Sequence, residues 1–187
     1  MNPATRGVKL TYDDFVHFPD DGLRHELIDG VHYVTPSPNI THQKLVGRLH
    51  LAIGSWLQTH PIGELFLSPL DVVFSEFDVV EPDLLYVSHE RATSILTALN
   101  VQGTPELVIE IGSPSTSKRD ETIKRVLYER VGVSEYWFVD PDRRAIRVYR
   151  LEASRFADPI ELSGKRGEVL TTPLIGGLEL KLTEIFQ

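Results

Sequence analysis

Residues 106–139 read ELVIEIGSPSTSKRDETIKRVLYERVGVSEYWFV and decide the fold, because they contain a strand, a helix and a second strand in succession. The apolar run Glu106–Ile111 predicts a central strand. The spacing Ser117-x-x-Asp120 is that of a capping box, which predicts a helix over Lys118–Val131. The segment EYWFVD after this helix predicts the second strand. These elements indicate an α/β fold with a mixed sheet.

The chain before this stretch predicts a short helix, a hairpin and a long helix. Thr11-x-x-Asp14 is another capping box, and it opens a helix over residues 12–18. Asp29-Gly30 lies between HELI and VHYV and predicts a type I′ hairpin, because that turn needs positive φ at both central residues. The long helix is predicted over residues 41–59 from one apolar stripe, formed by Leu45, Leu49, Ile53, Trp56 and Leu57.

Further elements follow on both sides of the deciding stretch. Strands are predicted at Glu64–Phe74 and Val79–Val87, with a turn at residues 75–78 between them. A helix is predicted at Arg91–Asn100. After EYWFVD, Asp140-Pro141 begins a turn and IRVYRL predicts the returning strand.

Residues 156–187 predict a hairpin around residues 164–167 and a short last strand. No stretch has the composition of a linker, so we expect one domain over residues 1–187. Its parts are an N-terminal helix and hairpin at 10–35, a core at 41–151 and a C-terminal β extension at 156–187. The predicted fold class is α/β, with a central mixed β-sheet flanked by helices and a β-hairpin at each end.

Composition excludes several classes of protein. The chain carries 19 Lys and Arg against 27 Asp and Glu, a formal net charge of −8, which argues against a general nucleic-acid coating protein. The absence of cysteine excludes disulfides, thiolate metal sites and cysteine nucleophiles. No apolar run approaches the ~20 residues of a membrane span, and no secretory signal is visible. We therefore expect a cytoplasmic protein without a membrane partner.

Two acids interrupt apolar strands. Asp83 follows Pro82 and opens LLYV, and Glu110 lies within LVIEI. A carboxylate buried in a strand costs several kcal/mol unless it is paired, protonated or bound to a metal. Strand alternation places Glu110 on the face opposite Ile109 and Ile111, near the end of the strand where α/β sheets bind ligands. If the two strands pair, the carboxylates converge and form a hard-oxygen site for Mg²⁺ or Mn²⁺.

The helix after Glu110 supplies a third group. Asp120, Lys124 and Tyr128 are spaced i, i+4, i+8 and form a row beside the apolar stripe Ile123, Leu127, Val131. Lys124 lies about 60° from Leu127 on a wheel of ~3.6 residues per turn, so we expect it to be partly buried. From there its ammonium group can reach back to the acids.

Each of these residues also has a structural interpretation. Asp83 can bond a nearby turn, Glu110 can face solvent on an edge strand, and Lys124 can pair with Asp120 at the surface.

Three more residues are interpreted first as structural. Glu26 in HELI favours a cross-strand partner, His42 favours a local hydrogen bond at the helix start, and Tyr128 favours packing.

The order helix, strand, strand with Pro82-Asp83, strand with Glu110, helix, strand resembles the core of the PD-(D/E)XK nuclease superfamily. The segments HELIDG, PSP with His42, EPDLLYV, PELVIEIGSPST and GVSEYWFVDP, together with Asp120-x-x-x-Lys124-x-x-x-Tyr128, are similar to a large bacterial family of restriction-endonuclease-like proteins. The resemblance covers residues 10–150 and the LIGGLEL tail.

This resemblance implies a restriction-endonuclease-like fold and a divalent-metal-dependent phosphodiesterase, with Asp83 and Glu110 as metal ligands and Mg²⁺ or Mn²⁺ as cofactor. The family's strand motif has a lysine two residues after the glutamate, where this chain has Gly112. The superfamily can carry that lysine on the following helix, and Lys124 matches the migrated position. Glu26 matches an additional acidic position near such sites.

The leading hypothesis is hydrolysis of a nucleic-acid phosphodiester bond, with DNA as the expected substrate. Asp83 and Glu110 hold the metal, Lys124 orients the attacking water or offsets phosphate charge, and Glu26 completes the metal shell through water. The candidate phosphate contacts are Lys118, Arg119, Arg125, Arg143, Arg144 and Arg147. The alternative for the last three is a solvated hairpin. A homodimer is also expected, because nucleases that cut duplexes often use two sites.

Two other functions stay open at this point. A catalytically degenerate nuclease fold could serve as a binding or assembly module, which the acidic charge and Gly112 favour. A metal-dependent hydrolase of small phosphoesters would bind metal without binding nucleic acid.

Overall fold

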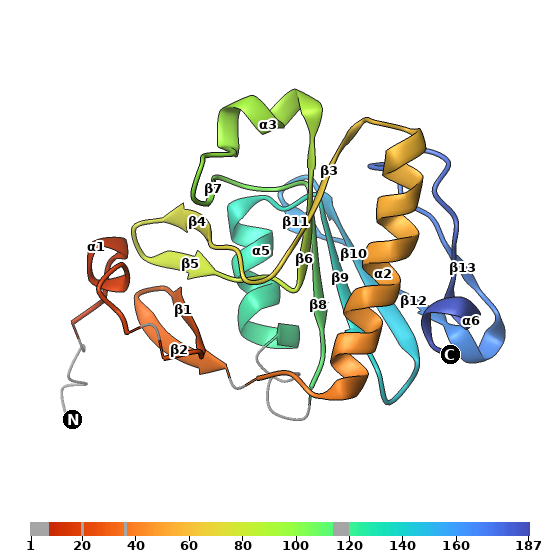
Figure 1. Cartoon of the computed structure of the whole chain (residues 1–187), viewed down its shortest axis with the longest axis horizontal. Coiled ribbons are helices and arrows are strands. Elements are labelled where there is room, and N and C mark those ends of the chain that lie inside the picture. Colours follow the sequence, from red (N-terminus) through yellow and green to blue (C-terminus); the bar gives the residue numbers. More distant parts are fainter. Residues whose placement is uncertain (1–7, 20, 36, 114–119) are drawn as a thin grey trace.

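The structure is a computed structural model that describes residues 8–19, 21–35, 37–113 and 120–187. Two sheets organise the described chain (Figure 1). The larger, seven-stranded sheet has the order β11-β10-β9-β8-β6-β3, with β12 also pairing with β10. Its strands are β3 (Gly63–Leu67), β6 (Leu84–Ser88), β8 (Leu107–Ile111), β9 (Glu135–Asp140), β10 (Ala145–Glu152), β11 (Arg155–Phe156) and β12 (Ile160–Ser163).

A five-stranded sheet with the order β2-β1-β5-β4-β7 lies beside the larger one. Its strands are β1 (Arg24–Ile28), β2 (Val31–Thr35), β4 (Val72–Ser75), β5 (Asp78–Val80) and β7 (Val101–Gln102). The helices are α1 (Tyr12–Phe15), α2 (Ile40–Thr59), α3 (His89–Ile95), α5 (Arg125–Val131) and α6 (Leu182–Ile185), with a π-helical turn η1 (Asp120–Lys124) before α5 and a 3-10 turn η2 (Gly164–Arg166). A third pair joins β13 (Val169–Leu170) to β14 (Leu180–Lys181).

Strand β8 is the centre of the large sheet, as the sequence predicts. It pairs antiparallel with β6 and parallel with β9, which makes the sheet mixed. Leu107, Ile109 and Ile111 pack on one face with the apolar stripe of α2, whereas Val108 packs on the other face with Leu127 of α5. Figure 1 shows α2 and α5 on opposite sides of this sheet. Both faces of β8 are therefore covered, and any polar side chain on it is buried.

The local signals at the N-terminal end are confirmed. Thr11 and Asp14 form a reciprocal capping box at α1, although the helix ends at Phe15 rather than near residue 18. Asp29 and Gly30 have φ values of 52° and 71°, as the predicted hairpin between β1 and β2 requires. The long helix spans residues 40–59 and is capped by Asn39.

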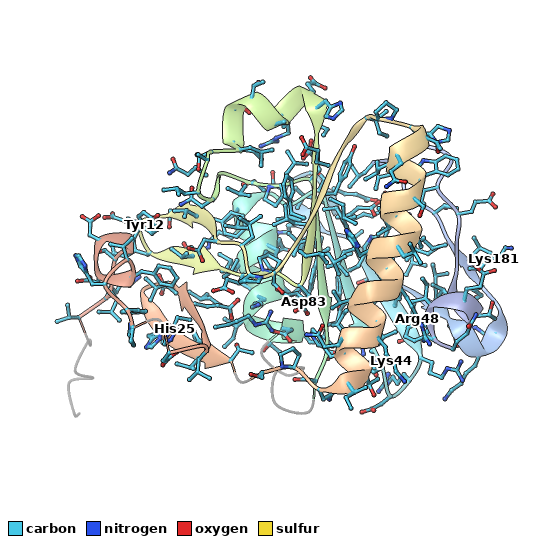
Figure 2. The ribbon with its side chains drawn as sticks, in the orientation of Figure 1. Tyr12, His25, Lys44, Arg48, Asp83 and Lys181 are labelled. Carbon is cyan, nitrogen blue, oxygen red and sulfur yellow. The ribbon has the colours of Figure 1, made fainter. Side chains whose placement is uncertain are left out.

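The two strands predicted around residues 64–87 are each divided in the structure. The first becomes β3 and β4, interrupted near Pro69, and the second becomes β5 and β6, interrupted at Pro82. Proline cannot donate to a ladder, so each strand ends beside one. The interruptions let the chain pass between sheets, because β3 and β6 belong to the large sheet while β4 and β5 belong to the small one. Asp83 lies at the second crossing, in the interior between the small sheet and α2 (Figure 2).

Two helix predictions need correction. The helix predicted at 91–100 begins at His89, because the Ser88 side chain caps it, and ends at Ile95. The helix predicted at 118–131 begins, within the described residues, with the π-helical turn. This wider turn, with i→i+5 bonds, changes the phase of the helix, so Ile123 is 38% exposed while Asp120 and Lys124 are each 2% exposed. The capping residue Ser117 lies outside the described residues.

The predicted hairpin around residues 164–167 is also wrong. This segment is the 3-10 turn η2, and the strands on either side of it pair elsewhere, β12 with β10 and β13 with β14. The short last strand is confirmed as β14. Among the described residues no helix combines the length and the apolar character that crossing a membrane requires.

Close packing of β3 on β6 gives a stability prediction. A Cβ atom on Gly63 would lie 2.5 Å from both the Tyr86 ring and the Val87 carbonyl oxygen. We expect Gly63→Ala to lower the free energy of unfolding by about 1–3 kcal/mol, because Tyr86 is buried and cannot yield. Urea denaturation measures this change. Gly54→Ala is the matched control: nothing lies within 4 Å of its Cβ position inside α2, so it should gain about 0.5–1 kcal/mol.

Candidate active site

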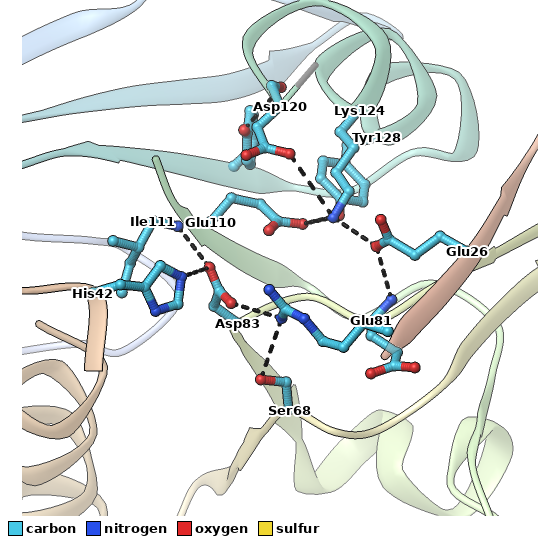
Figure 3. Close-up of polar contacts among 12 residues, drawn as sticks. Glu26, His42, Ser68, Glu81, Asp83, Glu110, Ile111, Asp120, Lys124 and Tyr128 are labelled. Atoms are coloured by element: carbon cyan, nitrogen blue, oxygen red, sulfur yellow. Dashed lines mark hydrogen bonds and ion pairs between the residues drawn. The ribbon is translucent and has the colours of Figure 1, made fainter. Parts of the chain in front are cut away.

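The Lys124 ammonium group lies at the centre of a buried group of acids. Its Nζ is 2.7 Å from Glu26 Oε1, 2.8 Å from Glu110 Oε1 and 4.0 Å from Asp120 Oδ1. These side chains come from β1, β8 and the start of η1, and Figure 3 shows them pointing toward one another. The Tyr128 hydroxyl, one turn further along α5, donates to the same Glu110 oxygen. The row Asp120, Lys124, Tyr128 is therefore the buried face of this helix.

A second cluster surrounds Asp83, which is 1% exposed. Arg24 Nη1 donates to Asp83 Oδ1 at 2.9 Å, and His42 Nε2 lies 2.9 Å from Oδ2. The Ile111 N–H also donates to Oδ2, at 2.8 Å. Asp83 therefore joins the small sheet, the first turn of α2 and the end of β8.

Strand register brings the two clusters together. Leu84 of β6 is opposite Ile109 of β8, so the preceding Asp83 is level with the end of β8 that carries Glu110. The hydrogen bond that the Ile111 N–H donates to Asp83 fixes this alignment. The two carboxylates predicted to converge thus lie at the same end of neighbouring strands, Asp83 just before β6 and Glu110 near the end of β8 (Figure 3).

The electrostatics of the two carboxyl groups differ. Burial raises the pKa of Glu110, Lys124 partly opposes this, and the nearby Asp120, Asp83 and Glu26 add to it, so that the pKa reaches about 8.

Burial would also raise the pKa of Asp83. The pKa is nevertheless lowered overall, because His42, Arg24 and the Ile111 N–H stabilise the ionised form. Burial depresses the pKa of Lys124, yet the acids Glu110, Glu26 and Asp120 outweigh it, so the pKa is raised. The site therefore combines an ionised Asp83 with a Glu110 that keeps its proton to unusually high pH. Lys124 stays charged beside Glu110.

A pocket of about 500 Å³ opens beside Asp83. Its lining comes from the start of β1, the segment before α2, the first turns of α2, the β3–β4 connection and Glu81. Both side chains that bond Asp83, Arg24 and His42, belong to this lining. The pocket therefore gives access to the Asp83 cluster from outside.

The structure brings together Asp83, Glu110, Lys124 and Glu26, the four residues predicted to be catalytic. It does not bring to them the four predicted phosphate contacts that lie within the described residues, Arg125, Arg143, Arg144 and Arg147. Arg143 and Arg147 pair with Asp140 and Glu161 at the β9–β10 turn, and Arg147 also pairs with Glu121.

The remaining phosphate candidates are placed in other ways. Arg144 donates to the Phe186 carbonyl oxygen, and Arg125 lies over the Tyr149 ring at 5.9 Å. Lys118 and Arg119 lie outside the described residues.

Four residues of this region were not assigned to the site from the sequence. Arg24 shares a strand face with Glu26 two positions later, so strand alternation could have found it. His42 and Tyr128 were interpreted as structural, although both bond a candidate metal ligand. Glu81 was not considered, yet burial and the nearby Asp71 raise its pKa to about 7.

The donor set can be tested for its fit to a divalent cation. Among the described residues, no three His, Asp or Glu side chains are already arranged as a metal cage. The donors are nevertheless hard oxygens, and a bound cation would favour the ionised form of Glu110, which burial and the neighbouring acids disfavour. The carboxylate oxygens of Asp83 and Glu110 are therefore suitable ligands for Mg²⁺ or Mn²⁺. Glu110 would then contact both the ion and Lys124.

Comparison with known proteins agrees with this fold. The Uma2 family model, described as "Putative restriction endonuclease", matches residues 12–183. A crystal structure of "a putative nuclease belonging to DUF820" from Anabaena variabilis superposes with a TM-score of 0.80 at 22% identity, covering 95% of this chain and 97% of that one. No curated protein matches.

Removal of the central cation tests the electrostatic description. We expect Lys124→Met to lower the free energy of unfolding by about 3–5 kcal/mol at pH 8, because it leaves buried carboxylates uncompensated. The double variant Lys124→Met/Glu110→Gln should recover part of this loss. Urea denaturation provides the measurement, and an unchanged single variant would contradict the buried ion pairs.

The raised pKa of Glu110 predicts a pH dependence. Folding raises this pKa from 4.5 to about 8, so the folded protein favours the protonated form. The resulting stability is complete below pH 4.5 and is lost as the pH rises toward 8. Glu110→Gln is neutral at every pH and should gain stability relative to wild type between pH 5 and about 8. Parallel denaturation curves at several pH values measure this difference; a constant difference would contradict the shift.

Proposed function

The chain belongs to the Uma2 family, and we propose that it is a divalent-metal-dependent endonuclease that hydrolyses phosphodiester bonds, with DNA as substrate. One observation carries this proposal. Asp83, Glu110 and Lys124 come from three separate segments and lie buried in two adjacent clusters, where β6 begins and β8 ends. Burial of so many charges is costly for a purely structural purpose, and such clusters concentrate at functional sites.

Asp83 and Glu110 would hold Mg²⁺ or Mn²⁺, and Glu26 would complete the shell through water. The ion, when bound, supplies Lewis acidity toward the phosphate and lowers the pKa of an attacking water. Arg24, His42 and the Ile111 N–H hold the Asp83 carboxylate in one orientation and keep it ionised. Asp83 is therefore ready to accept a cation without a change of protonation.

Lys124 supplies the positive charge that the reaction requires from the protein. Its ammonium group donates to Glu110 at 2.8 Å, which places it beside the proposed metal ligand. From that position it orients the attacking water or stabilises the negative charge that develops on the phosphate. This position of Lys124 supports its role as the lysine that the family's motif has two residues after the glutamate, where this chain has Gly112. Tyr128 fixes the Glu110 side chain through its hydroxyl group.

One observation favours a second function, a catalytically degenerate binding module. Glu110 is already neutralised in part by Lys124, and Lys124 has three acidic neighbours. If the Lys124 ammonium group never gives up Glu110 to a metal ion, the cluster serves only to stabilise the fold. A homodimer and a cytoplasmic location stay predictions under either function.

Cleavage assays separate the two functions. We expect Asp83→Asn and Glu110→Gln each to reduce Mg²⁺- or Mn²⁺-dependent cleavage of DNA by about 10²-fold or more, because each replaces a carboxyl group that can bind the ion as an anion with a neutral amide. Asp13→Asn, on the exposed surface of α1, is the matched control and should retain activity. Undiminished cleavage by both site variants would contradict the assignment.

A further inference from the structure

The pocket beside Asp83 has a charge pattern of its own. Arg24 is its one Lys or Arg and Glu81 its one acid, among the described residues that line it. The polar part of the lining also has His42 and the neutral donors Thr35, Ser37, Gln43 and Ser68. The apolar remainder includes Leu67 and Pro69. Hydroxyl, amide and guanidinium groups are the donors that proteins use to bind phosphate oxygens.

The Arg24 guanidinium group can bind an additional anion. Its contacts to Asp83 at 2.9 Å and to Ser68 at 3.5 Å both use Nη1. A guanidinium group carries five N–H donors in a planar fork, so Arg24 can keep Asp83 and still donate to a phosphate oxygen. The ion pair with Asp83 and the coulombic effect of Glu110 and Glu26 raise the pKa of Arg24 despite its burial, so its charge is permanent.

A second, independent observation comes from α2. His42 lines the pocket and is only 4% exposed. Its Nε2 donates to the Asp83 carboxylate, so Nδ1 of the neutral ring is an acceptor, and it has no hydrogen-bond partner within the described chain. Leaving a buried polar atom without a partner is costly, and such atoms commonly belong to binding sites. His42 also lies in the first turn of a 20-residue helix, whose N-terminal end attracts anions. In Figure 3, His42, Ser68 and Glu81 lie around Asp83 on the side away from Lys124.

We propose that this pocket binds a backbone phosphate of the nucleic-acid strand next to the bond that is cleaved, with Arg24 as its charged contact. The inference rests on the proposed function, because it takes a polynucleotide as the ligand. Arg24 takes the role that the sequence suggested for Arg143 and Arg147 near the β9–β10 turn, because those two arginines are paired with acids. Arg24 would connect strand binding to the metal site, because it pairs with Asp83 and would also donate to a phosphate of the nucleic-acid strand.

Binding can be measured apart from cleavage. Fluorescence anisotropy with a labelled single-stranded DNA oligonucleotide in Ca²⁺ buffer gives the affinity, and a gel checks that the probe stays intact. We expect Arg24→Gln to weaken binding about tenfold or more and to reduce the slope of log K against log [salt] by about 0.7, which is one phosphate contact. A merely structural role for Arg24 would leave that slope unchanged.

Gln43→Glu provides a variant that avoids the Asp83 cluster. It puts a negative charge in the pocket without loss of shape, and we expect about three- to tenfold weaker binding. Gln102→Glu is the matched control, because Gln102 is exposed on β7, outside the pocket, and takes the same change of charge. Circular dichroism establishes that all three variants are folded.

The outcomes separate this inference from the proposed function. Unchanged affinity and salt slope in Arg24→Gln and Gln43→Glu overturn the phosphate site, even if the wild type cleaves DNA. A nucleoside monophosphate that binds as tightly as the oligonucleotide overturns the assignment to a strand. Weaker binding by both variants, with Gln102→Glu unchanged, supports the site even if Mg²⁺-dependent cleavage is not found.

Discussion

The ion pairs of one buried ammonium group hold the candidate site together. Lys124 contacts Glu26 of the small sheet and Glu110 of the large sheet at 2.7 and 2.8 Å, and so it joins the two sheets through the helix that covers them. None of these charges could be buried alone, because the desolvation of a single ion is not repaid by the fold. The contact also affects the protonation of Glu110, because Lys124 lowers the pKa that burial and the other acids raise.

The second constraint is the passage of the chain between sheets. The interruption at Pro82 ends β5 in the small sheet and allows β6 to start in the large one. Asp83 lies at this crossing, where it can bond Arg24 of the small sheet and the Ile111 N–H of the large sheet at once. The proline that divides the strand thereby helps to place the carboxylate beside Glu110, so fold and candidate chemistry share one local cause.

Much of this arrangement could be predicted from the sequence, where short-range patterns decide it. Alternation in LVIEI correctly separates Glu110 from the face that packs on α2, and Asp29-Gly30 correctly predicts the hairpin. The phase of the helix could not be obtained from a regular wheel, because the π-helical turn exposes Ile123 and buries Asp120. Arg24 and His42 could not be assigned to Asp83 either, because their contacts span 59 and 41 residues and depend on how the two sheets meet.

Calorimetric titration of Mn²⁺ into the wild-type protein and into Glu110→Ala tests the central claim most directly, with an oligonucleotide present in a parallel series. The account predicts that the wild type binds Mn²⁺ and that binding vanishes in the variant, since the hard-oxygen site needs both carboxylates. If the wild type binds no Mn²⁺ with or without the oligonucleotide, or if the folded variant binds it equally well, the buried acids do not form a metal site and the degenerate-module function replaces the nuclease.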